Sequence, residues 1–239
     1  MKEQIKKIAL RTIELEARSV EGLQTSITDE FVKAVEALAA TKGRVVISGI
    51  GKSAVIAQKI VATFNSTGTP SIFMHAADAI HGDLGMIQQD DVVMILSKSG
   101  ESPEIKALVQ LIKNFGNTII AIVGNTQSFL ASQSSLILDT TVEQEACPNN
   151  LAPTSSTTAQ LVMGDALAIC LMELKGFKST DFAKFHPGGA LGKKLYLRVQ
   201  DLAVQNENSK IKLFSSYYQQ SGLDGLLLME KLKYLLLLH

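Results

Sequence analysis

The chain has 239 residues, of which 46% are hydrophobic and 19% are charged, and its 23 basic residues balance its 23 acidic ones. This length allows one α/β domain of about 200 residues with an appendage, and a net charge of zero without a long basic run argues against a nucleic-acid partner. The N-terminus lacks the apolar core of a signal peptide, and Asp165 interrupts the longest apolar stretch, so we expect no membrane partner. The two cysteines, Cys147 and Cys170, have no metal-ligand spacing and suit a reducing cytoplasm.

Two helices are predicted over residues 3–40. Apolar residues recur at helical spacing from Ile5 to Leu23 and again from Phe31 to Ala39, and Thr28 followed by two acidic residues is typical of a helix start. Helices of this kind usually cover a core or a partner subunit, so we assign them no chemistry.

A glycine turn follows the first predicted strand, residues 44–48. A triphosphate-binding loop would need glycine at the position of Val46, which argues against a nucleoside triphosphatase. Residues 49–54 fit the loose G-x-G-x-x-A dinucleotide pattern, but the second strand, 71–74, runs into His75 where that fold places an acidic residue. The glycines therefore serve to turn the backbone tightly near a ligand, with Lys52 beside it.

The segment after the second strand, residues 76–85, is predicted to be a helix and a turn in which polar residues interrupt the apolar ones. His81 lies there between apolar residues and glycine. A structural histidine and a functional one are both compatible with this pattern.

Residues 92–106 are the centre of the predicted fold. An apolar run, 92–96, predicts a strand buried on both faces. A serine-rich turn follows, and Ser102 with Pro103 opens a helix over 103–115, with serine as the cap. Hydroxyls and free backbone N–H groups thus meet at a positive helix end, which suits a phosphate. An ordinary capped turn is the alternative, although three serines and a lysine within six residues exceed what capping requires.

Further strands are predicted at 118–123 and 136–139, and a long loop then leads to an apolar helix over 157–174, capped by the hydroxyl cluster 154–158. Strands and helices that alternate at this spacing predict an α/β fold, a three-layer αβα sandwich around a parallel sheet. The polar loops all leave the carboxyl ends of strands. They therefore lie on one edge of the sheet, where ligands bind.

Five motifs resemble the sugar isomerase (SIS) domain family, specifically its arabinose-5-phosphate isomerases, between about residues 40 and 200. They are Ser48-Gly49-Ile50-Gly51-Lys52-Ser53, His81-Gly82-Asp83-Leu84-Gly85-Met86, Ser97-Lys98-Ser99-Gly100-Glu101-Ser102-Pro103-Glu104, the pair Glu145-Ala146-Cys147-Pro148 and Leu151-Ala152-Pro153-Thr154-Ser155-Ser156-Thr157-Thr158-Ala159, and His186-Pro187-Gly188-Gly189-Ala190-Leu191-Gly192. The serine turn marks only the broad superfamily, whereas the later motifs are specific to the isomerase and its close relatives.

The resemblance implies a flavodoxin-like sheet of five parallel strands, in a homotetramer with sites at subunit contacts, and the composition already indicates a cytoplasmic protein. It implies interconversion of D-ribulose 5-phosphate and D-arabinose 5-phosphate through a cis-enediolate, without a cofactor, as the entry to Kdo for lipopolysaccharide. The catalytic residues it implies are Lys52, His81, Glu104, Glu145 and His186. Those expected to bind substrate or phosphate are Ser48, Gly49, Gly51, Ser53, Ser97, Ser99, Ser102, Thr154, Ser155 and Ser156.

Several roles stay open at this point. Glu104 or Glu145 could be the base at carbon, and His81 or His186 could open the sugar ring, while Lys52 would stabilise the developing oxyanion. At the second helical position Glu104 is also stabilised by the helix dipole, by about 0.3–1 kcal/mol, without any catalytic role.

Two other functions use the same fold. One is a non-catalytic sugar-phosphate sensor, although residues 1–40 show neither a basic surface nor the Gly-containing turn of a DNA-binding helix-turn-helix. The other is an isomerase of another phosphosugar. Relatives commonly continue into a pair of CBS modules, so we divide the chain into an isomerase domain, 1–202, and a short tail, 203–239, that is not a complete CBS domain.

Overall fold

The computed structural model of the chain describes residues 1–188. The chain forms two compact units, Met1–Phe185 and His186–His239. All the helices and strands that the structure describes belong to the first unit, and the predicted tail at 203–239 lies outside the described residues.

The first unit is built on one sheet of five parallel strands. The strands are β1 (Val45–Gly49), β2 (Ser71–His75), β3 (Val92–Ser97), β4 (Ile119–Val123) and β5 (Leu136–Asp139), in the order β2-β1-β3-β4-β5. The three central strands are buried along their whole length, as their continuous apolar runs predict. Fold class and strand number are as predicted from the sequence, and the order is that of flavodoxin-like folds.

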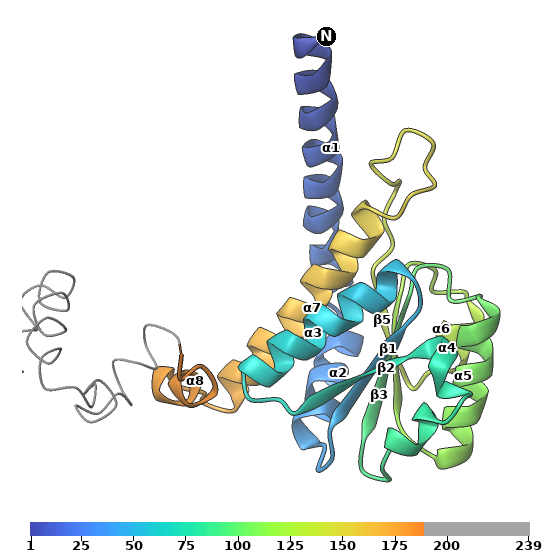
Figure 1. Cartoon of the computed structure of the whole chain (residues 1–239), viewed down its shortest axis with the longest axis vertical. Coiled ribbons are helices and arrows are strands. Elements are labelled where there is room, and N and C mark those ends of the chain that lie inside the picture. Colours follow the sequence, from blue (N-terminus) through green and yellow to red (C-terminus); the bar gives the residue numbers. More distant parts are fainter. Residues whose placement is uncertain (189–239) are drawn as a thin grey trace, which may run out of the picture. The chain divides into compact units, whose positions relative to one another are not determined.

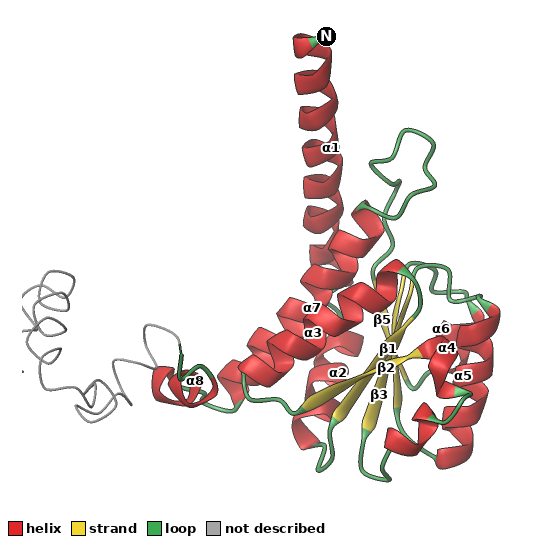
Figure 2. Cartoon of the chain, viewed as in Figure 1, coloured by secondary structure: helices red, strands yellow, loops and turns green. Residues whose placement is uncertain are grey.

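Helices cover both faces of the sheet (Figures 1 and 2). One apolar core joins the sheet to α2 (Asp29–Ala40), α3 (Lys52–Ser66) and α7 (Ser155–Leu174), and a second joins it to α4 (Ala76–Ala79), α5 (Pro103–Phe115) and α6 (Phe129–Gln133). Short 3-10 helices η1 (Leu23–Ser26) and η2 (Asp83–Met86) and the helix α8 (Ser179–Phe185) complete the unit. The three-layer architecture is therefore confirmed.

The first helix, α1 (Lys2–Gly22), differs from the other α-helices of the described residues because it has no buried residue. Its C-terminal part lies against α7, where Thr158 donates a hydrogen bond to Glu16 at 2.9 Å. Its N-terminal turns extend beyond the sheet domain (Figure 1) and leave Ile5, Leu10 and Ile13 between 60% and 67% exposed.

The helix α7 is long and apolar enough to cross a membrane by length and composition alone. In this structure it is a core helix, because residues such as Met163, Leu167 and Leu171 are buried against the sheet domain. Asp165, on another side of the helix, forms an ion pair with Lys59 of α3 at 2.5 Å.

Two details differ from the sequence predictions. The apolar helix begins at Ser155 rather than at residue 157, and α6 and α8 were not predicted. Helices of five and seven residues are too short for apolar periodicity to reveal.

Candidate active site

The strand order puts a topological switch point between β1 and β3. The chain leaves β1 towards β2 on one side and leaves β3 towards β4 on the other, which opens a crevice at the carboxyl ends of these strands. Gly49, the last residue of β1, lies beside Leu96 of β3 in the register. The glycine turn 49–53 and the serine turn 97–102 therefore meet at this crevice, as the sequence predicted.

The turn after β1 brings the backbone into close contact with itself. A Cβ atom on Gly49 would lie 3.0 Å from the carbonyl carbon and oxygen of Ser53, and Gly51 has a φ of +57°. Both glycines are thus required by the turn itself, and Lys52 begins α3 there with an exposed side chain. At the end of β1, Ser48 is fully buried and its Oγ has no hydrogen-bond partner among the described residues.

The turn after β3 holds its hydroxyls ready to donate. Ser97 Oγ accepts a hydrogen bond from Gly100 N at 3.0 Å, and Ser99 Oγ accepts one from Glu101 N at 3.3 Å. A hydroxyl that accepts in this way keeps its O–H for another acceptor. The buried Oγ of Ser102 has no partner in the part of the chain that the structure describes.

Ser102 occupies the N-cap position of α5 with Pro103 after it, but its side chain makes no capping hydrogen bond. The predicted cap is therefore wrong in its chemistry, although its position is right. The first N–H groups of α5 consequently have no side-chain acceptor among residues 1–188, and an anion is the natural partner for donors at a helix N-terminus.

Glu101 fastens this turn to α6. Its Oε1 accepts a hydrogen bond from Phe129 N at 2.6 Å, and its Oε2 pairs with Lys106 Nζ at 2.6 Å. The hydrogen bond from Lys106, followed by that from the Phe129 backbone, lowers the pKa of Glu101. Glu101 therefore stays charged and holds the serine turn against α5 and α6.

Glu145 lies at the N-terminus of α7 with only 2% of its surface exposed. Its Oε1 lies 2.7 Å from Lys98 Nζ and accepts a hydrogen bond from Ser156 Oγ at 2.6 Å. Its Oε2 accepts hydrogen bonds from the backbone N–H groups of Thr154 and Ser156, at 2.8 and 3.1 Å, and from Thr154 Oγ1 at 3.2 Å. Glu145, and not the hydroxyl cluster predicted from the sequence, caps α7.

These contacts determine the ionisation of Glu145. Burial by itself would raise its pKa, but the hydrogen bonds from Lys98, Ser156 and the backbone of Thr154 outweigh it and lower the pKa to about 2. Of the three hydroxyls predicted to bind substrate here, Thr154 and Ser156 both donate to Glu145. Only Ser155, whose buried Oγ has no partner among the described residues, remains available.

The other predicted catalytic residues differ in their exposure. Glu104 is the second residue of α5 and is partly buried, and its carboxylate makes no hydrogen bond or ion pair with the described residues. His81 is exposed in the turn between α4 and η2. Their predicted roles at carbon and at the ring oxygen stay predictions.

His186 is the first residue of the second unit, and its predicted role also stays a prediction. The glycine motif after it lies outside the described residues from 189 onwards. The two turns of the crevice and Glu145 all belong to the first unit.

A pocket of about 200 Å³ lies between α1 and the segment that leads to Glu145, and no residue of the serine turn lines it. Leu15, Arg18 and Ser19 line one side of it, and residues 141–144 line the other. None of the predicted site residues lines this pocket, so the strand-edge crevice is the better candidate for chemistry.

The family model of the SIS domain matches residues 38–170. The chain belongs to the SIS domain family. The match includes both turns of the crevice and Glu145, and it stops before His186. The resemblance seen in the sequence motifs is thereby confirmed at the level of the family.

Relatives share the same region at high identity. The chain is 57% identical over 194 residues to arabinose 5-phosphate isomerase KdsD of Pseudomonas aeruginosa, covering 81% of this chain and 60% of that protein. It is 41% identical over 226 residues to arabinose 5-phosphate isomerase KpsF of Escherichia coli O6:H1, covering 92% and 69%. The chain thus spans about 60% of the length of the first of these relatives.

Among solved structures, the E. coli CFT073 protein c3406 in complex with arabinose 5-phosphate superposes with a TM-score of 0.75 at 42% identity. The superposition covers 77% of this chain and 98% of that one. The fold is therefore shared with a protein whose structure holds a sugar phosphate.

Lys98 is the residue of this site that sequence reasoning missed. It was visible as a lysine within the serine turn, but its partner Glu145 lies far along the chain. A physical signal is nevertheless present: a buried glutamate needs a nearby cation, and Lys98 follows a strand that ends at the same edge of the sheet.

Proposed function

We propose that the chain is an aldose–ketose isomerase that interconverts D-arabinose 5-phosphate and D-ribulose 5-phosphate. The observation that carries the proposal is the phosphate seat at the switch point, in a chain 57% identical to an arabinose 5-phosphate isomerase. The seat combines the buried hydroxyl of Ser102 with the N-terminus of α5, and neither has a side-chain partner in the part of the chain that the structure describes. The D-arabinose 5-phosphate formed by the enzyme would be used to make Kdo for lipopolysaccharide, and the enzyme would act in the cytoplasm.

The reaction needs few groups, and each has a candidate in the chain. Once the ring of the aldose is open, a base removes the proton from C2 and returns it to C1, while a proton moves from O2 to O1. The intermediate is a cis-enediolate, whose negative charge a nearby cation such as Lys52 stabilises. His81 or His186 would open the ring and move the proton between the oxygens.

Glu104 is the better candidate for the carbon base. It follows Ser102 by two positions, at the same helix N-terminus that would hold the phosphate. Its carboxylate has no acceptor site filled by the described residues, so it can take a proton. Proximity to a phosphate held at a fixed point is what orients the sugar against such a base.

The test is turnover of purified protein with D-arabinose 5-phosphate, followed as ribulose 5-phosphate formed, with ribose 5-phosphate and glucose 6-phosphate as controls. We expect selective turnover, and Glu104→Gln should lower kcat by about 10²- to 10⁴-fold with little change in sugar-phosphate binding. Binding without turnover by the wild type would instead identify a sensor. A Glu104→Gln variant with a near-normal rate would exclude Glu104 as the base.

We also propose that the protein is a homotetramer with sites at subunit contacts. The support is α1, whose apolar residues Ile5, Ile8, Leu10 and Ile13 are 47–67% exposed. A helix with no buried residue is seldom stable unless another surface covers its apolar side. A second copy of the chain would supply that surface.

A further inference from the structure

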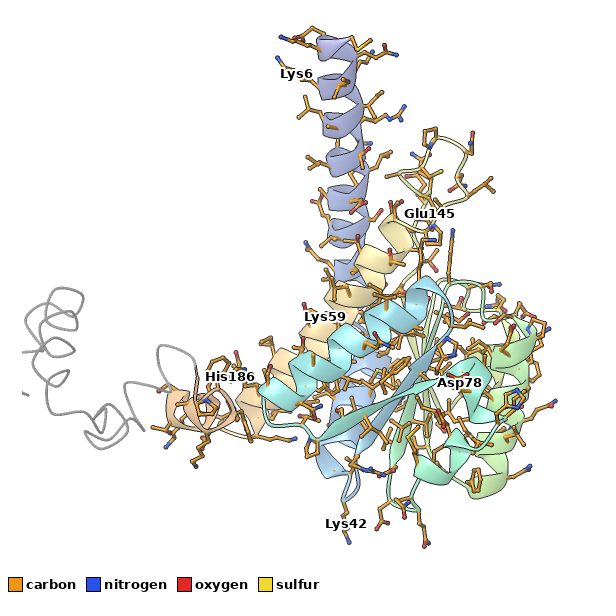
Figure 3. The ribbon with its side chains drawn as sticks, viewed as in Figure 1. Lys6, Lys42, Lys59, Asp78, Glu145 and His186 are labelled. Atoms are coloured by element: carbon orange, nitrogen blue, oxygen red, sulfur yellow. The ribbon has the colours of Figure 1, made fainter. Side chains whose placement is uncertain are left out.

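An ion pair joins two distant segments at the edge of the candidate site. Lys98 lies in the serine turn after β3, and Glu145 lies before α7, where Figure 3 shows it at the start of the helix. Their side chains meet at 2.7 Å, with the carboxylate fully buried and the lysine side chain 44% exposed. The backbone of Lys98 is held as well, because its carbonyl accepts a hydrogen bond from Gly124 N at 3.1 Å.

The carboxylate of Glu145 has no capacity left for another proton donor. A carboxylate offers about four lone-pair sites on two oxygens. The contacts with Lys98, Thr154 and Ser156 supply two donors to Oε1 and three to Oε2. A proton taken from carbon would have to displace one of these donors, and a group that stays ionised so readily is a poor match for a base working near neutral pH.

We propose that Lys98 is a positioning residue of the active site, and that Glu145 is its counter-ion and the cap of α7 rather than the base at carbon. We call the pair Lys98–Glu145 the clasp. It ties the serine turn to the Thr154–Ser156 segment, so two sides of the substrate site keep a fixed spacing. This inference rests on the proposed isomerase function. It adds Lys98 to the active site and gives Glu145 a structural role instead of a catalytic one.

The clasp makes a specific kinetic prediction. Loss of either partner lets the serine turn and the start of α7 move apart, which weakens phosphate binding and misorients the sugar. Lys98→Met and Glu145→Gln should therefore both raise KM and lower kcat, with a fall of about tenfold or more in kcat/KM. Because both variants break the same contact, the double variant should lose no more than the worse single one. Lys98→Arg keeps a cation in the turn and should recover most of the loss.

The chain contains a matched control. Lys59 and Asp165 also form a lysine–carboxylate pair that ends on α7, at 2.5 Å, and the Lys59 side chain is 45% exposed. This pair joins α3 to α7, and its hydrogen bonds involve no residue of the glycine turn or the serine turn. Lys59→Met should therefore leave kcat/KM within about twofold of the wild type.

The experiment measures KM, kcat and the pH dependence of kcat/KM for the wild type and these five variants. If Glu145 is the base, Glu145→Gln alone will lose kcat by about 10²-fold or more at unchanged KM, its acid limb will vanish, and the double variant will be far worse than Lys98→Met. That result would overturn the proposal. A Lys98→Met variant with wild-type kinetics would overturn it too.

A second readout does not depend on turnover. In the clasp, Glu145 has a pKa lowered to about 2 from its ordinary 4.5, so its contribution to stability is complete above pH 4.5 and is lost as the pH falls towards 2. The difference in denaturation midpoint between the wild type and Glu145→Gln should thus be full at pH 7 and shrink below pH 4.5. If the wild type turns over no sugar phosphate but shows this pattern, the isomerase proposal fails while the clasp stands. A difference that does not change with pH would show that the clasp itself is absent.

Discussion

Replacing Gly100 by alanine is expected to damage the serine turn far more than the same change at another left-handed glycine. Gly100 has a φ of +65°, and a Cβ atom there would lie 2.6 Å from Ser128 Cβ and closer still to Ser128 Oγ. Ser128 cannot easily move away, because it is 1% exposed and its Oγ caps α6 by accepting a hydrogen bond from Ala131 N at 3.3 Å.

The expected loss has two parts. Alanine in the left-handed region costs about 1 kcal/mol relative to glycine, and an overpacked contact with a buried neighbour costs a further ~1–3 kcal/mol. Gly100→Ala should therefore lower the free energy of unfolding by about 2–4 kcal/mol. Gly116→Ala is the matched control: Gly116 has a φ of +78° at the end of α5, but nothing lies within 4 Å of its added Cβ. Its cost should be the backbone part alone, about 1 kcal/mol.

The assay is urea denaturation at pH 7 followed by circular dichroism, together with KM for D-arabinose 5-phosphate. Because Gly100 N donates a hydrogen bond to Ser97 Oγ, a displaced turn would also move the hydroxyls that are proposed to bind the phosphate. A loss of about 1.4 kcal/mol in binding corresponds to about a tenfold rise in KM. Equal losses of stability in the two variants, or an unchanged KM in Gly100→Ala, would refute the reasoning.

Two further predictions concern parts of the fold away from the crevice. Asp91, which is 3% exposed at the amino end of β3, accepts hydrogen bonds from Arg44 and from Gln88 N, and these outweigh burial and lower its pKa. Asp91→Asn should lower the free energy of unfolding by about 2–4 kcal/mol at pH 7 and leave kcat unchanged. The difference in unfolding midpoint between the wild type and this variant should disappear as the pH falls below the ordinary carboxyl pKa of 3.8. A difference independent of pH would contradict this. Changing Leu10 and Ile13 of α1 to aspartate should lower the mass measured by light scattering, and an unchanged mass would remove α1 from the proposed interface.

Much of the fold follows from local patterns in the sequence. The apolar runs at 92–96, 118–123 and 136–139 correspond to β3, β4 and β5 to within one residue at each end. Parallel pairing then forces the turns after β1 and β3 onto one edge, so the location of the crevice follows from strand order rather than from any single motif.

The chemistry at the start of α7 could not be predicted in the same way. Hydroxyls in a row before an apolar helix are typical of N-caps, and this pattern favoured Thr154 and its neighbours as the cap. The cap is instead Glu145, nine residues earlier, because a buried charged acceptor at a helix N-terminus binds the backbone N–H groups more strongly than a hydroxyl does. Such a contact depends on how the loop 146–153 folds back, which no local pattern records.

The contacts at the two helix N-termini also distinguish Glu104 from Glu145, which the sequence leaves as equal candidates for the base at carbon. Both lie at the N-terminus of a helix, where the dipole favours a negative charge. Glu145 uses all its acceptor sites to hold Lys98 and the start of α7, so its charge is already compensated by fixed donors. Glu104 has no such partner among the described residues, and Pro103 before it provides no N–H group. A carboxylate can remove a proton from carbon only where its lone pairs are unoccupied when substrate arrives, and Glu104 meets that condition while Glu145 does not.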